Sequence, residues 1–163
     1  GPQMNSGAAQ ATGDWLLFLH ADTWLPAPCN GWLAVIGDSQ AQWGRFNVRL
    51  SGRQWPFRII ETGINWRSRL TGIATGDQAL FLRRKHFSKM LGFADIPLME
   101  DIELCRRLRR VSKPLCLGEA VTTSSRRWER GGIMRTIILM WCLRARYFWG
   151  ADPVTLAKCY RQS

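Results

Sequence analysis

LLFLHADT, residues 16–23, is a hydrophobic run that ends abruptly in a short polar turn. Together with Trp15 it predicts a strand over residues 15–20 at the centre of a sheet, because unbroken runs of large apolar side chains are typical of strands buried on both faces. Asp22 then lies just beyond the carboxyl end of this strand. Because ligands of open α/β sheets bind outside those ends, Asp22 is a candidate site residue.

A second acidic site opens the segment MEDIELCRRLRR, residues 99–110. Its mixture of apolar and basic residues predicts a helix from Glu100 to Arg110. A carboxylate such as Asp101 at a helix start, combined with Asp22 at a strand end, would pair a metal or phosphate anchor with a general base. Acidic residues in a first helical turn also complement the helix dipole, so a purely structural role stays open on the residues alone.

Elsewhere strands alternate with helices, which predicts an α/β sheet flanked by helices. Further strands are expected at 43–50, 78–83 and 115–122. Helices are expected at 3–12, 31–36, 57–70, 84–90, 132–148 and after Pro153. Apolar and polar residues alternate over 43–50, so that strand should be half-exposed. No repeat or linker divides residues 1–163, and we expect a single domain with terminal helices over 132–163.

The composition is ordinary for a globular protein in everything but its charge. Hydrophobic residues make up 46% and charged residues 21%, while the formal net charge is +11. Such a charge implies an anionic partner: a nucleotide, a phospholipid surface, a nucleic acid or a phosphorylated substrate. The five cysteines form no CxxC pair and no Cys/His cluster with metal-ligand spacing, which favours buried, reduced thiols in a cytosolic protein.

The polar start of the sequence shows no signal-peptide pattern, and the apolar run at 137–143 is too short to span a bilayer. The segment 133–149 combines apolar residues with Arg135, Arg144 and Arg146 and ends in aromatic residues. Two interpretations stay open for it: core or oligomer packing, and a helix lying on a membrane surface. We expect a cytoplasmic protein, which in the second case is associated with the inner face of the membrane and takes a lipid-linked acceptor.

Four ordered motifs resemble family-2 glycosyltransferases. QMNSGAAQATGDWLLFLHADT, residues 3–23, has the pattern of that family's Asn-x-Gly helix, Ala-x-Gly-Asp turn and DxD-type motif; the matching positions are Asn5, Gly7, Gly13, Asp14 and Asp22. The segments at 76–93, 93–110 and 125–128 resemble its acceptor-side strand and helix, its acidic ED segment and its basic-Trp motif. The resemblance covers nearly the entire chain and extends to small bacterial radical-SAM/selenodomain-associated glycosyltransferase-like proteins.

This resemblance implies a GT-A-like, Rossmann-type nucleotide-diphospho-sugar transferase fold with a mostly parallel sheet. It also implies an activated-sugar donor, a divalent metal and inversion at the anomeric carbon. The first βα units of such enzymes are missing, so the chain should correspond to their carboxyl-terminal two-thirds. Two positions depart from the family pattern: His20 replaces the first Asp of DxD, and Ser124 replaces the Gln of the basic motif.

The same resemblance implies roles for individual residues. Asp22, assisted by His20, would hold a divalent metal (Mn²⁺ or Mg²⁺) against the diphosphate. Asp101 would deprotonate the acceptor hydroxyl, and Glu100 would orient the acceptor. The expected substrate-binding residues are Asn5, Gly76, Asp77, Gln78, Arg126, Arg127 and Trp128. Basic loops and glycine turns occur in many proteins for structural reasons alone, and that explanation stays open for these residues.

Three other functions stay open. A truncated, non-catalytic transferase fold acting as a scaffold would carry the same motifs, and a nucleotidyltransferase would share the fold type and the metal-binding Asp. A nucleic-acid-binding module would explain the charge and the nine tryptophans, but these are scattered through apolar segments without a recognition motif. The expected partners are therefore a nucleotide-sugar donor and an unidentified acceptor, with no nucleic acid; a homo-oligomer is compatible with the sequence.

Overall fold

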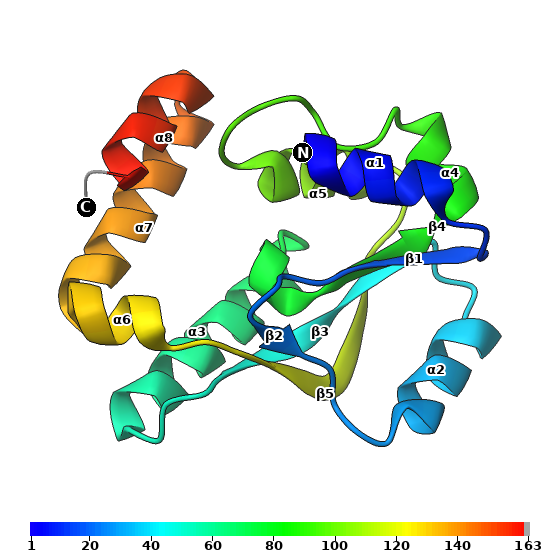
Figure 1. Ribbon diagram of the computed structural model, residues 1–163, viewed down its shortest axis with the longest axis horizontal. Helices are drawn as coiled ribbons and strands as arrows, with labels where there is room; N and C mark the ends of the chain where they lie inside the picture. The colour runs from blue at the N-terminus through cyan, green and yellow to red at the C-terminus, as the bar shows by residue number, and fades with distance from the viewer. Residues whose placement is uncertain (162–163) are drawn as a thin grey trace.

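The computed structural model describes residues 1–161 as a mixed α/β fold, in which eight α-helices surround a curled five-stranded sheet (Figure 1). The strands are β1 (Trp15–Phe18), β2 (Thr23–Trp24), β3 (Trp43–Leu50), β4 (Leu80–Arg83) and β5 (Leu115–Thr123). The helices are α1 (Pro2–Gln10), α2 (Cys29–Asp38), α3 (Trp55–Thr71), α4 (Arg84–Lys89), α5 (Glu100–Leu108), α6 (Arg126–Gly131), α7 (Ile133–Phe148) and α8 (Pro153–Arg161). A 3₁₀ turn, η1 (Gly76–Gln78), precedes β4. The sequence predicted all of these elements except β2, α6 and η1.

The sheet has the strand order β1-β4-β3-β5-β2, and three of its four strand pairs are antiparallel. Only β3 and β5 run parallel among the described residues. The prediction of a mostly parallel sheet is therefore wrong. A helix between two strands allows a parallel crossover but does not require one, because the second strand can also insert beside a different neighbour.

β1 lies at an edge of this sheet, paired with β4, so its predicted central position is wrong. Its side chains are nevertheless largely apolar because both of its faces are partly covered. Leu16 and Phe18 pack with α1 and α4, while Trp15 packs on Phe81 from the opposite face. Leu17 remains 37% exposed. An apolar run therefore indicates that the faces of a strand are covered, but it does not indicate whether the strand is central or at an edge of the sheet.

β3 is almost entirely buried, which corrects the prediction of a half-exposed strand. Arg45 is one of the polar residues in this alternation, but only 1% of it is accessible. The Arg45 guanidinium instead donates hydrogen bonds to the carbonyl oxygens of Phe46 and Asn65 and to the side chain of Asn47. Its Nε atom is buried without a partner, so the two terminal nitrogens supply the hydrogen bonds of this interior cation.

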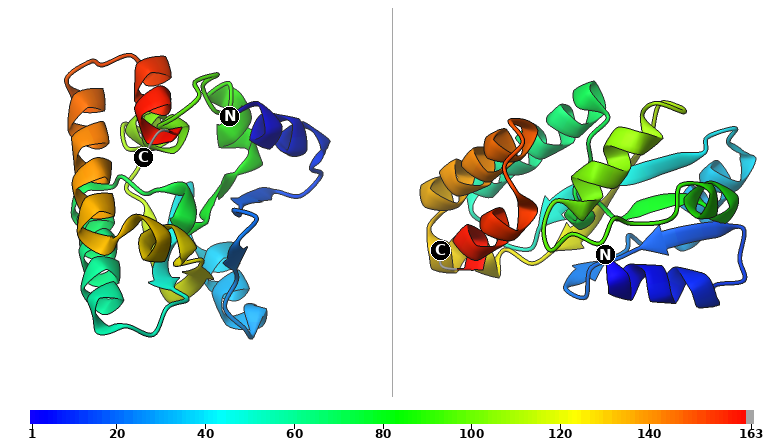
Figure 2. Two further views of the ribbon diagram at one scale, coloured as in Figure 1. Left: turned by 60° about the vertical axis from the view of Figure 1, so that its left-hand side comes forward. Right: turned by 90° about the horizontal axis from the view of Figure 1, so that it is seen from above.

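The sheet separates two apolar clusters, because alternate side chains of a strand point to opposite faces. In β4, Leu80 and Leu82 belong to the larger cluster and Phe81 to the smaller one. Helices α1, α4, α5, α7 and α8 contribute to the larger cluster, and α2 covers the smaller one through Trp32 and Ile36. Both views in Figure 2 show α7 and α8 side by side at one end of the molecule. The carboxyl-terminal helices are thus part of the core.

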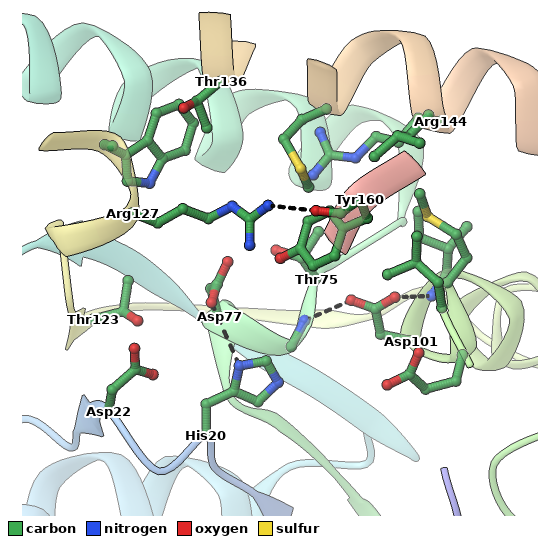
Figure 3. A pocket seen from close by; sticks show the side chains of 18 of the residues that line it. His20, Asp22, Thr75, Asp77, Asp101, Thr123, Arg127, Thr136, Arg144 and Tyr160 are labelled. Atoms are coloured by element: carbon green, nitrogen blue, oxygen red, sulfur yellow. Dashed lines mark hydrogen bonds and ion pairs between the residues drawn. The ribbon is translucent and has the colours of Figure 1, made fainter. Parts of the chain in front are cut away.

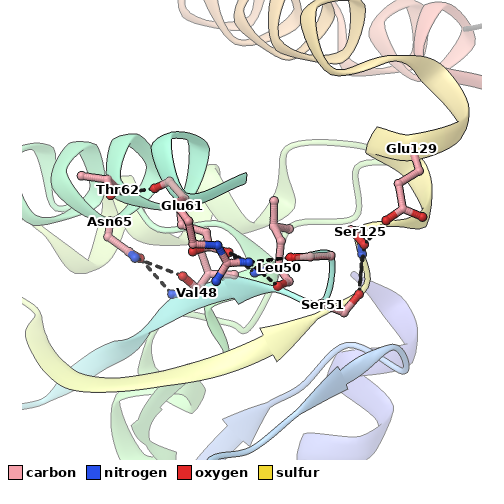
Figure 4. A network of polar contacts seen from close by, with 10 residues as sticks. Val48, Leu50, Ser51, Glu61, Thr62, Asn65, Ser125 and Glu129 are labelled. Atoms are coloured by element: carbon pink, nitrogen blue, oxygen red, sulfur yellow. Dashed lines mark hydrogen bonds and ion pairs between the residues drawn. The ribbon is translucent and has the colours of Figure 1, made fainter. Parts of the chain in front are cut away.

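Polar side chains of α3 complete the hydrogen bonding of β3 beyond the point where β4 ends (Figure 4). The Glu61 carboxylate accepts the backbone N–H of Leu50 at 2.6 Å. The Asn65 amide accepts the N–H of Val48 at 2.9 Å and donates to its carbonyl at 3.1 Å. These contacts fix α3 against the sheet, because buried backbone groups without partners are costly.

Ser51 joins the end of β3 to the start of α6 (Figure 4). Its hydroxyl lies 3.0 Å from the Ser125 hydroxyl and accepts the Ser125 backbone N–H at 3.1 Å. Ser125 in turn donates to the Glu129 carboxylate at 2.8 Å. The Ser51–Ser125 pair therefore helps to anchor the segment that carries Arg126, Arg127 and Trp128 to the end of β3.

Two expectations from the sequence concern the burial of the cysteines and the length of the apolar segments. The five cysteines are free thiols, but Cys29 and Cys142 are exposed, so their predicted burial is wrong. Within residues 1–161, no helix combines the length and the apolar character needed to cross a bilayer. α7 packs Thr136 and Leu143 into the interior, while Trp141 is 70% exposed.

Candidate functional site

A cleft of about 440 Å³ lies between the turns at the edge of the sheet and the helices α6, α7 and α8 (Figure 3). It gathers four segments that are far apart in the sequence: the turn after β1, η1, the start of α5, and α6. The predicted site residues that line it are His20, Asp22, Gly76, Asp77, Glu100, Asp101, Arg127 and Trp128. The fold thus brings together both acidic sites and part of the basic motif.

Asn5 does not line this cleft. Its side-chain amide donates to the carbonyl of Phe93 and accepts the N–H of the same residue, both at 2.9 Å. Gly92, with a φ of +70°, lies so close that a Cβ there would be 2.5 Å from the Asn5 Oδ1 atom. In this structure Asn5 fastens α1 to the loop that leads to α5.

Gln78 and Arg126 also lie outside the cleft lining. Gln78 is fully buried, forms a capping box with Thr75 around η1, and donates to the Ser68 hydroxyl at 2.9 Å. Arg126 is exposed and donates to the Ser124 hydroxyl at 3.1 Å. Arg126 lines a neighbouring basic groove instead, together with Arg127, Arg130, Arg135 and Arg161.

Asp101 lies in the first turn of α5 and is held in place by two backbone donors, one from η1 and one from α5 itself. Its carboxylate accepts the N–H of Gly76 at 2.7 Å and that of Ile102 at 2.7 Å (Figure 3). Burial raises the pKa of Asp101 above its ordinary value, and the charge of Glu100 adds to the rise, while the two donors oppose it. A positioned carboxylate with a raised pKa has the properties that a general base requires.

Met99 is the residue immediately before α5, and its backbone conformation turns the chain into that helix. It is buried, lines the cleft, and has a φ of +69°, a left-handed conformation that a residue with a side chain rarely adopts. Such backbone strain costs on the order of 1–3 kcal/mol and persists where surrounding contacts impose it. The sequence did not point to Met99, because a methionine carries no signal of its backbone angle.

His20 and Asp77 face each other across the middle of the cleft. The His20 Nδ1 atom lies 3.5 Å from Asp77 Oδ1, and each side chain is about half exposed, at 47% and 51%. The Asp77 carboxylate raises the pKa of the His20 imidazole, against burial, which lowers it. A Cβ on Gly76 would stand 2.1 Å from His20 Nε2, so glycine at this position lets the ring approach the η1 backbone.

Asp22 lies on the exposed turn between β1 and β2. Its backbone carbonyl accepts the N–H of Ser124 at 3.2 Å, and β2 pairs with the end of β5, where Thr23 donates to the Thr123 hydroxyl at 3.0 Å. Among residues 1–161, no hydrogen bond or ion pair occupies the Asp22 carboxylate. Both of its oxygens are therefore available to a ligand, while its backbone is fixed.

A protein-only metal site is not formed by the described residues, since no three His, Cys, Asp or Glu side chains gather closely enough. The donor set nevertheless fits a divalent cation that shares its coordination with a substrate. Mg²⁺ and Mn²⁺ in phosphate-binding sites use one or two carboxylates, and substrate oxygens and water complete the shell. The free carboxylate of Asp22 meets this requirement, with His20 in the same turn.

The opposite side of the cleft is basic. Figure 3 shows Arg127 and Arg144 on the side of the carboxyl-terminal helices, across from Asp22 and Asp101. The Arg127 guanidinium stacks 3.7 Å from the ring centroid of Tyr160 and donates to its backbone carbonyl at 3.4 Å. Burial lowers the pKa of Arg144, against the nearby charge of Asp101, which raises it.

Arg144 and Tyr160 were missed as site residues. Thr136, Met140 and Arg144 follow one another at spacings of four, so a helical projection would have grouped them on one face of α7. That projection does not say what the face points toward. Tyr160 carries no signal at all, because its place in the cleft depends on the packing of α8 through Leu156.

No family model, no curated protein and no solved structure matches this chain. What the arrangement can do chemically therefore follows from the cleft. Its acidic side offers a free carboxylate and a positioned base, and its basic side offers guanidinium groups for an anion. This separation of charge fits a ligand with an anionic group, such as phosphate, against the guanidinium groups and a reacting hydroxyl near Asp101.

Proposed function

We propose that this protein is an inverting, metal-assisted glycosyltransferase of the family-2 type with a GT-A-like fold, which moves a sugar from a nucleotide-diphosphate donor to an acceptor hydroxyl. One observation carries the proposal. Asp22, Asp77, Asp101 and Arg127 come from four separate segments and line a single cleft. The resemblance assigns the same segments to donor, metal, base and diphosphate contacts.

In the proposed reaction, the acceptor oxygen attacks the anomeric carbon from the face opposite the diphosphate. A new carbon–oxygen bond forms from a lone pair of the acceptor, and the bond to the diphosphate oxygen breaks, leaving its electron pair on the nucleoside diphosphate. Asp101 takes the acceptor proton, and its raised pKa suits this step because the proton must be accepted during the attack. The two N–H groups that hold Asp101 keep its carboxylate in position for it.

The diphosphate occupies the end of the cleft near Asp22 in this proposal. A divalent cation bound there would neutralise charge on the leaving diphosphate. Arg127 adds a guanidinium that can recognise phosphate in two-point fashion, and Trp128 lines the same region. Asp77, with its pair to His20, lies between this end and Asp101, where the sugar hydroxyls would be bound.

Donor binding is the direct test. Thermal unfolding would be measured with UDP-, GDP- and dTDP-sugars, with and without Mn²⁺. A ligand that binds only the folded state stabilises it by about 2.7 kcal/mol at a hundredfold excess over its dissociation constant, so one nucleotide class should raise the melting temperature in the presence of metal. Asp22→Ala should abolish this shift, because it removes the carboxylate that anchors the cation.

Asp38→Ala is the matched control, since Asp38 is exposed at the end of α2 and does not line the cleft. It should retain the full ligand-induced shift. A shift that persists without metal, or that survives in Asp22→Ala, would contradict the assigned donor site. If none of the three donor classes shifts the melting temperature, the non-catalytic scaffold becomes the better explanation of the motifs.

A further inference from the structure

The outer side of α3 exposes large apolar side chains. Trp55, Ile59, Trp66 and Leu70 follow one another at spacings of four and seven residues, so they lie on one side of the helix. Each of them is at least 62% exposed. The buried residues of α3 lie on the opposite side, which packs on β3. The apolar stripe of α3 is therefore not used in the core.

The outer side of α7 has the same character. Met134, Ile138, Trp141 and Phe148 are spaced by four, three and seven residues, and each is at least 53% exposed. The buried residues of α7 again lie on the opposite side of the helix. These four residues, together with the four apolar residues of α3, are called the α3–α7 face.

The two stripes lie next to each other. A cavity of about 320 Å³ between the helices is lined by Arg67 and Thr71 from α3 and by Trp141 and Phe148 from α7. Both views in Figure 2 show α3 alongside α7 at the same end of the molecule. Because Trp141 and Phe148 belong to the face and also line this cavity, the stripes join across it. Folded proteins rarely leave a continuous apolar surface of this kind uncovered.

The charges around the face have one sign. Glu61 is the only acidic residue in either helix, and it is buried against the sheet, where it accepts the N–H of Leu50. Arg69, Arg135 and Arg146 are exposed and form no ion pair within residues 1–161. The α3–α7 face is thus an apolar surface with exposed arginines on both helices and no exposed carboxylate on either.

This combination matches the surface of an anionic lipid bilayer. Such a surface is negatively charged at its headgroups and apolar below them, so it can satisfy both the arginines and the apolar stripes. Tryptophan is favoured at this boundary because its ring is large and apolar and its N–H group is polar. A second copy of the chain fits less well, because its face would bring the same arginines and a further net charge of +11.

We propose that the α3–α7 face binds the surface of an anionic lipid bilayer, with both helices lying on the membrane and the exposed arginines among its headgroups. The proposal extends the membrane-surface interpretation of segment 133–149 to α3, which the sequence pattern had not indicated. It does not rest on the proposed glycosyltransferase function, because it concerns residues on the outside of α3 and α7.

Vesicle sedimentation with the intact chain tests the proposal. Wild-type protein would be mixed with vesicles of phosphatidylcholine alone and with vesicles that also contain phosphatidylglycerol. It should bind the anionic vesicles more tightly, and added salt should weaken this binding because it screens the arginines. The assay contains no nucleotide sugar, so failure of bilayer binding and failure of the Asp22 donor site are observed separately.

Tryptophan variants test whether the face itself is the contact. Trp66→Ser and Trp141→Ser should each weaken binding to anionic vesicles by about tenfold, because each removes a large apolar side chain from the contact. Trp24→Ser is the matched control, since Trp24 is 59% exposed on β2 and lies outside the face. It should bind as wild type does. Melting temperatures measured in parallel would show that all three variants are folded.

Arginine variants test the contribution of charge. Arg69→Gln and Arg146→Gln should each weaken binding to anionic vesicles by about fivefold, the factor that corresponds to roughly 1 kcal/mol per basic residue near such a surface. Arg84→Gln is the control, because Arg84 is exposed at the start of α4, away from α3 and α7 (Figure 1). It should retain wild-type binding.

Three results would overturn the proposal. The first is absence of binding to anionic vesicles in wild type. The second is binding that is unchanged in Trp66→Ser and Trp141→Ser and falls equally in all three arginine variants, because that pattern is non-specific attraction of a basic protein. The third is a dimer that sedimentation velocity detects without vesicles and that Trp141→Ser dissociates, in a protein that does not bind vesicles; the face would then contact a second copy.

Discussion

The acidic and basic sides of the cleft hold their charged groups in different ways. On the acidic side, Asp101 accepts two backbone N–H groups, and Asp77 is paired with His20. On the basic side, Arg127 rests on the ring of Tyr160, and Arg144 has a buried Nε atom without a partner. The acidic side is thus organised by backbone turns at the sheet, and the basic side by the packing of helices.

This difference indicates how each side should respond to change. Groups fixed by backbone donors are preorganised for chemistry, which needs precise placement of the reacting atoms. Cations with unused donors are suited to binding, because their hydrogen-bonding capacity is completed by a ligand. Substitutions on the acidic side should therefore act mainly on turnover, and those on the basic side mainly on affinity and on the anchoring of helices.

The largest expected effect is that of Asp101→Asn on sugar transfer. Removing a general base typically costs about 10²–10⁴ in rate, and asparagine cannot take the acceptor proton. Initial rates would be measured with the nucleotide sugar that binds in the thermal-shift test. Asp95→Asn serves as the control, since Asp95 is exposed in the loop before α5 and outside the cleft. Retention of full activity in Asp101→Asn would remove the assigned base.

A smaller effect is expected where the basic side is anchored. Ser51→Ala changes an exposed residue but removes the acceptor of the Ser125 backbone N–H and a partner of the Ser125 hydroxyl, and Ser125 itself is buried. An unsatisfied buried donor costs about 1–3 kcal/mol, which chemical denaturation would report as a lower free energy of unfolding. Ser112→Ala is a sharp control, because the Ser112 hydroxyl is buried without a partner and its removal should cost nothing. Equal losses in both variants would contradict the anchoring role.

The smallest expected effect is a dependence of stability on pH that comes from Asp101. Burial raises the pKa of this carboxyl in the folded state, so the folded protein binds the proton more tightly than the unfolded chain. The resulting stabilisation is fully present below the unfolded pKa of about 3.9 and is lost as pH rises through the raised folded pKa. Wild type should therefore lose stability relative to Asp101→Asn over that window. Parallel curves for the two proteins would show that Asp101 titrates normally.

Local pattern was sufficient where one segment determines its own structure. The strand over 43–50 and the helix start at Glu100 were predicted because side-chain spacing and an acidic first turn are properties of neighbouring residues. Asp22 and Asp101 were singled out in the same way, from a strand end and a helix start, and both line the cleft. Asn5 and Gln78 carried equally clear motifs, yet their side chains bond to the protein itself.

The sequence pattern did not predict the relative directions of the strands. The alternation of strands and helices predicted a mostly parallel sheet, but β4 inserts between β1 and β3 and runs antiparallel to both. Which neighbour a strand finds depends on how the apolar faces of all the strands are covered together. That is a property of the assembled core and not of any one segment.

The sequence by itself determined the order of the elements, the positive charge and the acidic residues at strand and helix ends, because each depends on residues close together in the chain. Only the tertiary structure decided that Arg144 and Tyr160 line the same cleft as Asp101, and that Arg67 and Arg144 line one cavity between α3 and α7. The physical reason is that helix orientation is set by packing, here of Leu143 and Leu156 into the larger cluster. Their burial aims the polar residues of α7 and α8 at a site that no local pattern reveals.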